Sequence, residues 1–221
     1  MCEFFSFVGD GYGNFLYSDW ETRKNLTKEK SNESPDSHTW ILTHNKIPPR
    51  MQDRWSKYEY NPLTKKFTID EPVEGHDHES AKNWVEGLDF KKVIPYLIVK
   101  PIVNPLKRKV KKVTEKEIAL LKEWASICDS VMNSVGNSVM NSVIDSVMDS
   151  VGNSMSNSMW NSMWNSMWGY ISSFISIKCK YDFSSIITLW ESGFIPSFDG
   201  KTWRLHSGKN AKIVYEMKNK E

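Results

Sequence analysis

Short stretches in which apolar and polar residues alternate predict β-hairpins near both ends of the chain. Three are expected, at residues 4–17, 57–70 and 198–205. Glycines between residues 9 and 14 allow the first turn, and Asn61-Pro62 and Asp199-Gly200 are typical of the other two. These patterns predict antiparallel sheet in both halves of the chain.

Helical signals are fewer. Thr114 and Glu117 form a capping box that predicts a helix through Ala125, and a short helix is expected over residues 81–88. Residues 93–103 are apolar, but Pro95 and Pro101 predict extended chain there. Residues 186–190 fit a helix or a strand, and residues 211–217 a last strand or short helix.

A tract of ten consecutive four-residue units runs from Asp129 to Trp168. The first position is Asp or Asn, the second is always Ser, and the third is only Val or Met. The fourth varies from Gly to Trp. We therefore expect the third position to face inward and the fourth to face open space.

Two architectures compete for this tract. In a helix, each unit turns the Val/Met position by about 40°, so that nine units carry it once around the axis. A parallel β-solenoid keeps that position facing inward, with Asp or Asn and Ser at the corners. A solenoid is favoured over a long helix. Pentapeptide-repeat proteins, in which one repeat unit forms one side of the coil, are an analogy.

Together these elements predict an α+β fold, a hairpin-rich body with the repeat attached. The expected parts are an N-terminal α+β region (1–113), a connecting helix (114–128), the repeat (129–168) and a C-terminal region (169–221) that packs on the body.

Composition adds limits on the class of protein. The chain has 221 residues, a net charge of +2 and 39% hydrophobic residues, which is typical of a globular protein rather than a disordered one. Three scattered cysteines indicate a reducing compartment. No signal peptide and no uninterrupted apolar span is recognisable, so we expect a soluble cytoplasmic protein without a membrane partner.

Several stretches together resemble a group of uncharacterised proteins from gut bacteria and their phages. They are residues 1–8, residues 57–62, the tract with its continuation to Phe174, and residues 196–206. The resemblance covers most of the chain. It implies a phage or mobile-element setting, hence a host-cell cytoplasm, and no particular chemistry.

Cys2 is the one candidate for catalysis. Removal of Met1 would expose a cysteine whose own α-amine can act as its base. The start is similar to that of class II glutamine amidotransferases, but Glu3-Phe4 stands where they have Gly-Ile. An incidental cysteine is the favoured interpretation.

Two sets of polar residues have the chemistry to bind ligands. His76, Asp77 and His78 are weak metal candidates whose spacing is not that of a zinc finger, and a solvated loop is favoured. Trp203, Arg204 and His206 could grip an anion from the last hairpin, although an exposed hairpin end explains them equally well.

A run of basic residues before the predicted helix could bind phosphate groups. It consists of Lys107, Arg108, Lys109, Lys111 and Lys112. Trp160, Trp164 and Trp168 could then stack on bases. The simpler interpretation is a solvated face and tryptophans packed against a neighbouring domain.

The favoured function is a non-catalytic binding protein, directed at a host protein or a small ligand, with the repeat as its scaffold. The alternatives are an N-terminal-nucleophile hydrolase or amidotransferase-like enzyme that uses Cys2, and nucleic-acid binding through residues 107–112. We expect no cofactor. The sequence does not specify an oligomeric state.

Overall fold

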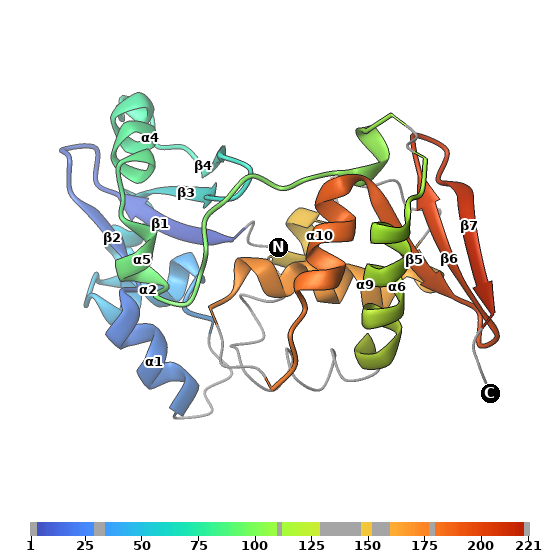
Figure 1. Cartoon of the computed structure of the whole chain (residues 1–221). Helices are drawn as coiled ribbons and strands as arrows, with labels where there is room; N and C mark the ends of the chain where they lie inside the picture. The colour runs from blue at the N-terminus through green and yellow to red at the C-terminus, as the bar shows by residue number, and fades with distance from the viewer. Residues whose placement is uncertain are drawn as a thin grey trace. The chain divides into compact units, whose positions relative to one another are not determined.

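The structure is a computed structural model that describes residues 4–28, 34–109, 112–128, 147–151, 160–176 and 180–218. The chain divides into two compact units, residues 1–99 and residues 100–221. Each unit combines helices with an antiparallel sheet, which confirms the predicted α+β class (Figure 1). The finer division at residues 113, 128 and 168, and the packing of the C-terminal region on the body, stay predictions.

The first unit contains a four-stranded antiparallel sheet and five helices among its described residues. In chain order the elements are β1 (Phe5–Gly9), β2 (Phe15–Tyr17), α1 (Trp20–Lys28), α2 (His38–His44), α3 (Pro49–Gln52), β3 (Ser56–Asn61), β4 (Lys66–Glu71), α4 (His78–Glu86) and α5 (Phe90–Val93). The strand order is β2-β1-β3-β4. Both predicted hairpins of this unit are confirmed.

The first hairpin depends on Asp10. Its carboxylate accepts hydrogen bonds from the backbone N–H groups of Tyr12 (2.8 Å) and Asn14 (3.1 Å) and from the Asn14 side chain (2.6 Å). Gly11 has φ +80°, and a Cβ there would come 2.3 Å from the His76 ring. Glycine is therefore required at this turn for both its conformation and its size.

Alternation along the strands gives the sheet two different faces. One face is aromatic. Its rings come from Phe5, Phe7, Phe15, Tyr17, Tyr58, Tyr60 and Phe67 of the sheet, with Trp84 of α4 and Phe90 of α5 packed against them. On the other face, Val8 of β1 forms a buried cluster with Ile41 and Leu42 of α2. α2 and α4 thus cover opposite faces.

The second unit contains a three-stranded antiparallel sheet and several helices. Its described elements are η1 (Pro105–Lys107), α6 (Glu115–Ile127), α9 (Trp160–Ile171), η4 (Ser172–Phe174), α10 (Ser184–Ser192), β5 (Phe194–Phe198), β6 (Thr202–Ser207) and β7 (Lys212–Lys218), and the strand order is β5-β6-β7. The capping box is confirmed, since Thr114 N–H donates to the Glu117 carboxylate (2.9 Å). The Asp-Gly hairpin is confirmed as β5 and β6.

The described parts of the tetrapeptide tract are helical, not solenoidal. Residues 147–151 are helical, and α9 contains residues 160–168. A period of four drifts by only about 40° per unit, so a helix of two or three units keeps its Val/Met position on one face. The argument against a helix depends on length and fails for such short stretches. Residues 129–146 and 152–159 of the tract lie outside the described residues.

Burial within the tract confirms one prediction and corrects another. The third position faces inward, as expected: Val147, Val151, Met163 and Met167 are all buried. The fourth position was expected to face open space, but Trp168 is half-buried and its indole N–H is buried. In α9 the fourth position therefore lies at the border of the core.

Helices of the second unit pack closely at Gly169. A Cβ at this position would come 2.7 Å from Cγ2 of Ile186 and 3.0 Å from Cη2 of Trp124. We expect Gly169→Ala to lower the free energy of unfolding by about 1–3 kcal/mol, because α9 must move away from α6 and α10. Urea denaturation measures this change. Gly87→Ala is the control, since its Cβ would meet only backbone oxygens at 3.5 Å or more, and an equal loss in both variants would contradict the packing argument.

Candidate functional site

A pocket of about 530 Å³ lies between α1 and α2 of the first unit. Its lining comes from Asp19, Glu21, Thr22, Asn25 and Leu26 at the start and along one side of α1, and from Trp40 and His44 of α2. The volume is within the range of small-molecule sites, about 300–1,000 Å³. The position of the two helices therefore decides the shape of the site.

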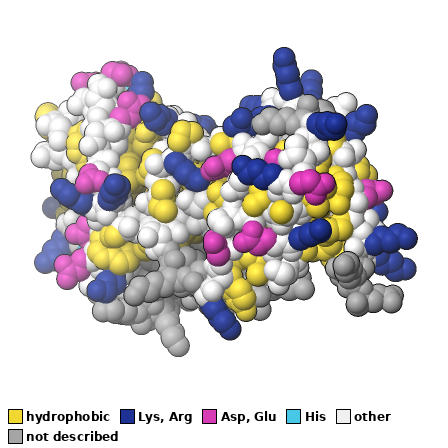
Figure 2. Space-filling view, viewed as in Figure 1, with side chains coloured by type: hydrophobic (Ala, Val, Ile, Leu, Met, Phe, Trp, Pro, Cys, Tyr) yellow, Lys and Arg dark blue, Asp and Glu magenta, His cyan; other side chains and the backbone are white. Residues whose placement is uncertain are grey.

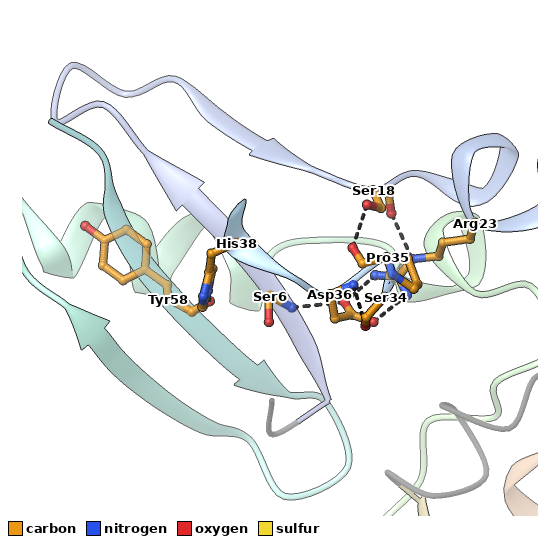
Figure 3. A network of polar contacts seen from close by, with 8 residues as sticks. All are labelled: Ser6, Ser18, Arg23, Ser34, Pro35, Asp36, His38 and Tyr58. Carbon is orange, nitrogen blue, oxygen red and sulfur yellow. Dashed lines mark hydrogen bonds and ion pairs between the residues drawn. The ribbon is translucent and has the colours of Figure 1, made fainter. Parts of the chain in front are cut away.

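A buried ion pair fixes α1 relative to the chain that leads into α2. Arg23 of α1 is 1% exposed, and its guanidinium donates two hydrogen bonds to the carboxylate of Asp36, at 2.6 and 2.9 Å (Figure 3). Such a fork-to-fork pair is both strong and directional. It holds one side of α1 against Asp36, which lies two residues before the first residue of α2.

Other polar groups of this pair also form hydrogen bonds. Arg23 Nε donates to the carbonyl oxygen of Ser18 (2.8 Å), and Asp36 accepts the backbone N–H of Ser6 in β1 (3.1 Å). The guanidinium also lies 5.7 Å from the centroid of the Phe5 ring. The ion pair thus joins α1, the segment before α2 and the sheet into one network (Figure 3).

The two helices of the pocket begin with side-chain caps. Asp19 accepts the backbone N–H of Thr22 (2.9 Å), and Ser37 accepts the backbone N–H of Trp40 (3.3 Å). Asp and Ser are preferred at this position because they satisfy otherwise unpaired N–H groups. Both caps are local to the sequence, whereas the ion pair that joins the helices is not.

One wall of the pocket is aromatic. Trp40 and His44 are four residues apart on α2, hence on one face of the helix. Their rings stack with centroids 4.4 Å apart and an interplanar angle of 16°. Trp40 also packs against the apolar cluster of Val8 and Ile41, which holds its ring in place.

The other wall carries negative charge. Hydrogen bonds from the backbone and side chain of Thr22 lower the pKa of Asp19, and the nearby charge of Arg23 acts in the same direction. Asp19 is therefore a carboxylate at neutral pH. Glu21 adds a second acidic side chain, and the lining includes neither Lys nor Arg. The pocket combines a flat aromatic surface with two acidic groups.

The predicted metal candidates do not form a ligand set. His76 Nδ1 is paired with the Ser56 hydroxyl (2.9 Å) and His78 Nδ1 with the Tyr58 hydroxyl (2.9 Å), while Asp77 caps α4. Within the described ranges, no three His, Cys, Asp or Glu side chains are grouped to hold a metal ion. These residues instead fasten the start of α4 to β3.

The last hairpin separates the residues that were predicted to grip an anion. Trp203 is buried and stacks on Phe198, with centroids 4.6 Å apart. Arg204 points to the other face and donates to Asp199 (2.6 Å) and Glu216 (2.8 Å), so its charge is already neutralised by two carboxylates. The anion-binding interpretation is therefore not supported at this residue.

His206 is likewise engaged within the sheet. Its Nε2 pairs with the Ser197 hydroxyl (2.8 Å) and its Nδ1 with the carbonyl oxygen of Ala211 (2.9 Å). Since a carbonyl only accepts, Nδ1 carries the proton and Nε2 accepts from Ser197 in the neutral ring. Burial lowers the pKa of His206, which favours this neutral form. Ser197 is itself buried, so the pair joins β5 to β6 rather than offering a nucleophile.

The basic run stays exposed, as expected for either of its interpretations. Lys107, Arg108, Lys109 and Lys112 are exposed, whereas Lys111 lies outside the described residues. The second unit has 16 Lys and Arg against 11 Asp and Glu, and the first has 13 against 16. Figure 2 shows basic side chains at the top and outer edge of the second unit.

The tryptophans of the tract do not form an open stacking surface where they are described. Trp164 and Trp168 are half-buried and meet edge to face, with ring centroids 6.3 Å apart. The side chain of Trp160 lies outside the described residues. Packing within the second unit accounts for Trp164 and Trp168, so these two residues do not support the proposed base-stacking role.

The cysteine prediction is not tested. Cys2 and Cys179 lie outside the described residues, and Cys128 is buried at the end of α6. An N-terminal nucleophile at Cys2 therefore stays a prediction. None of the described helices is long and apolar enough to cross a membrane.

Sequence reasoning missed the pocket between α1 and α2. Of the two histidines near Trp40, His38 has a structural role, because its Nε2 pairs with the carbonyl oxygen of Tyr58 (3.0 Å). The Trp40/His44 spacing of four residues was the available signal, but it indicates a site only once α2 is known to be a helix.

Comparison with known proteins adds no further constraint. The chain matches no protein-family model, no curated protein and no solved structure. The resemblance to phage and gut-bacterial proteins therefore stays a prediction, and the function must be argued from the site itself.

The network predicts a large effect from a single atom change at Asp36. We expect Asp36→Asn to lower the free energy of unfolding by about 3–5 kcal/mol, because it leaves the buried Arg23 charge uncompensated. Chemical denaturation followed by far-ultraviolet circular dichroism measures the loss. Glu71→Gln, which removes an exposed ion pair with Lys57, should cost about 1 kcal/mol or less. Similar losses in the two variants would mean that the Arg23–Asp36 pair has no special role.

Proposed function

We propose that the protein is a non-catalytic binding protein whose α1–α2 pocket receives a cationic group, an ammonium or a guanidinium. One observation carries the proposal: a pocket that combines the Trp40/His44 stack with the carboxylates of Asp19 and Glu21 and has neither Lys nor Arg in its lining.

The chemistry of the pocket fits a cation in two ways. An aromatic face attracts a positive charge by about 0.5–1 kcal/mol at exposed sites, and a tryptophan gives the strongest attraction. A carboxylate adds a charge-assisted hydrogen bond. Asp19 is suited to this role because the hydrogen bonds that lower its pKa also fix its position on α1. Because these contributions are small, we expect a single small amine to bind weakly, with a dissociation constant on the order of 10 mM.

The wider setting remains part of the proposal. A host protein that presents a lysine or arginine side chain, or a small amine, would supply the cation, and a host-cell cytoplasm under phage control is the proposed location. The repeat would serve as a scaffold. A stacked coil is compatible only with residues 129–146 and 152–159 of the tract, because the other parts are helical. No described residue favours the alternative enzyme hypothesis.

Nuclear magnetic resonance of the full-length protein tests the pocket. The probes are Nα-acetyl-lysine amide, Nα-acetyl-arginine amide and the neutral Nα-acetyl-norleucine amide. At least one of the cationic probes should shift the indole resonance of Trp40, which Trp40→Phe assigns, and the norleucine derivative should not. Equal shifts with the neutral probe would show that charge is not recognised.

Variants of the acidic wall test the same claim independently. Asp19→Asn keeps a preferred helix cap but removes the charge, and Glu21→Gln removes the second charge. We expect the double variant to bind the cationic probe about tenfold more weakly, the equivalent of two weakened charge contacts. Glu79→Gln changes an exposed carboxylate on α4 and should leave binding unchanged. Unaltered affinity in the double variant would refute the proposed site.

A further inference from the structure

The second unit opens with an extended segment, residues 100–104, that is held by side chains rather than by strand pairing. Pro101 fixes its own φ and restricts Lys100 to extended conformations. Pro101 within this stretch and Pro105 directly after it favour the polyproline II form. The segment is therefore stiff before it makes any contact.

Two buried aromatic side chains bind the backbone of Val103. Its N–H donates to the hydroxyl of Tyr170 (2.9 Å), and its carbonyl oxygen accepts the indole N–H of Trp190 (2.9 Å). The two rings are stacked with centroids 4.9 Å apart and an interplanar angle of 10°. Contacts of this kind depend on the backbone and not on the side chain at position 103.

Lys100, in contrast, is bound through its side chain. Its ammonium lies in a cage of two aromatic rings and one carboxylate. It is 5.5 Å from the centroid of the Tyr170 ring and 5.0 Å from that of Phe174, and 3.0 Å from a carboxylate oxygen of Glu191. Tyr170 and Phe174 meet edge to face at 5.2 Å, which gives the cage two walls. Aromatic faces with a nearby carboxylate are the usual receptor for an ammonium group.

The spacing of the two contacts matches a polyproline II ligand. That helix has three residues per turn and a rise of about 3.1 Å per residue, so positions i and i+3 lie on the same side about 9 Å apart. Lys100 and Val103 are likewise three residues apart in the sequence. Aromatic grooves that donate hydrogen bonds to such segments are a recurring mode of peptide recognition.

We propose that Tyr170, Phe174, Trp190 and Glu191 form a peptide-binding groove, occupied here by the chain's own residues 100–103. The groove accepts an extended lysine–proline segment of a partner protein, with the pattern Lys-Pro-x-x, in exchange for the internal one. This inference does not depend on the α1–α2 pocket. The opposite view is that residues 100–103 form a permanent strap that only covers the aromatic side chains.

Exchange has a predictable energetic signature. An internal segment competes at an effective concentration on the order of millimolar, so a free peptide binds the intact protein weakly. The apparent affinity of the peptide rises when the internal segment is weakened, because a larger fraction of the grooves is open. A permanent strap gives no such coupling.

The test uses full-length protein and a fluorescein-labelled hexapeptide, acetyl-Val-Lys-Pro-Ile-Val-Asn-amide, which copies residues 99–104. Fluorescence polarisation measures its binding to wild type and to Lys100→Gln. We expect Lys100→Gln to bind the hexapeptide about fivefold more tightly than wild type, and to bind a peptide with Gln in place of Lys about fivefold more weakly than the original.

Groove variants in the Lys100→Gln background locate the binding. Tyr170→Phe keeps the ring but removes the hydroxyl that accepts the N–H of residue 103, and Glu191→Gln removes the charge of the cage. Both should weaken the hexapeptide about fivefold. Glu123→Gln, an exposed carboxylate on α6, is the matched control and should have no effect. Thermal melting by circular dichroism verifies that each variant is folded.

Any of three binding results would overturn the proposal: no binding to folded Lys100→Gln, equal binding of the lysine and glutamine peptides, or equal effects of Glu191→Gln and Glu123→Gln. A dimer of Lys100→Gln in light scattering would also overturn it, since a second copy would then fill the groove.

A measurement on wild type covers the case in which Lys100→Gln does not fold. Hydrogen–deuterium exchange at residues 100–104 should accelerate when millimolar hexapeptide is added and stay unchanged with the glutamine peptide. Unchanged exchange with both peptides would show a permanent strap.

Discussion

The buried pair of Arg23 and Asp36 is the interaction on which the architecture of the first unit depends. It joins α1, the chain before α2 and β1. These three elements are not paired with one another as strands of a sheet, so the side-chain network connects them. A buried charge is tolerated only when it is paired and hydrogen-bonded, so neither residue can change alone. The shape of the acidic, aromatic pocket between α1 and α2 follows from this one constraint.

The two units use the same type of chemistry in different ways. In the first, carboxylates and a stacked ring pair surround an open pocket; in the second, Glu191 and the rings of Tyr170 and Phe174 already hold the ammonium of Lys100. The filled cage shows in atomic detail how this chain binds a cation. It therefore supports the view that the open pocket, with a similar set of side chains, is suited to the same class of group.

Local patterns in the sequence predicted much of the fold and little of the site. The hairpins and the capping box at Thr114 were predicted correctly because alternation and turn chemistry act within a few residues. The pairing of Arg23 with Asp36 spans 13 residues and that of Lys100 with Glu191 spans 91, and no local pattern indicates either. The sequence favoured a solenoid for the tract because the Val/Met position drifts around a long helix. This drift is too small to exclude the two short helical stretches that the structure describes, residues 147–151 and 160–168.

The central claim is that the buried ion pair positions the pocket, although neither of its residues lines it. Titration of the more strongly bound of the two cationic amides into wild type and Asp36→Asn, at a temperature where both are folded, tests this claim most directly. The account predicts that Asp36→Asn loses most of the binding while Asp19 and Glu21 remain unchanged. Equal affinity in the two proteins would contradict it.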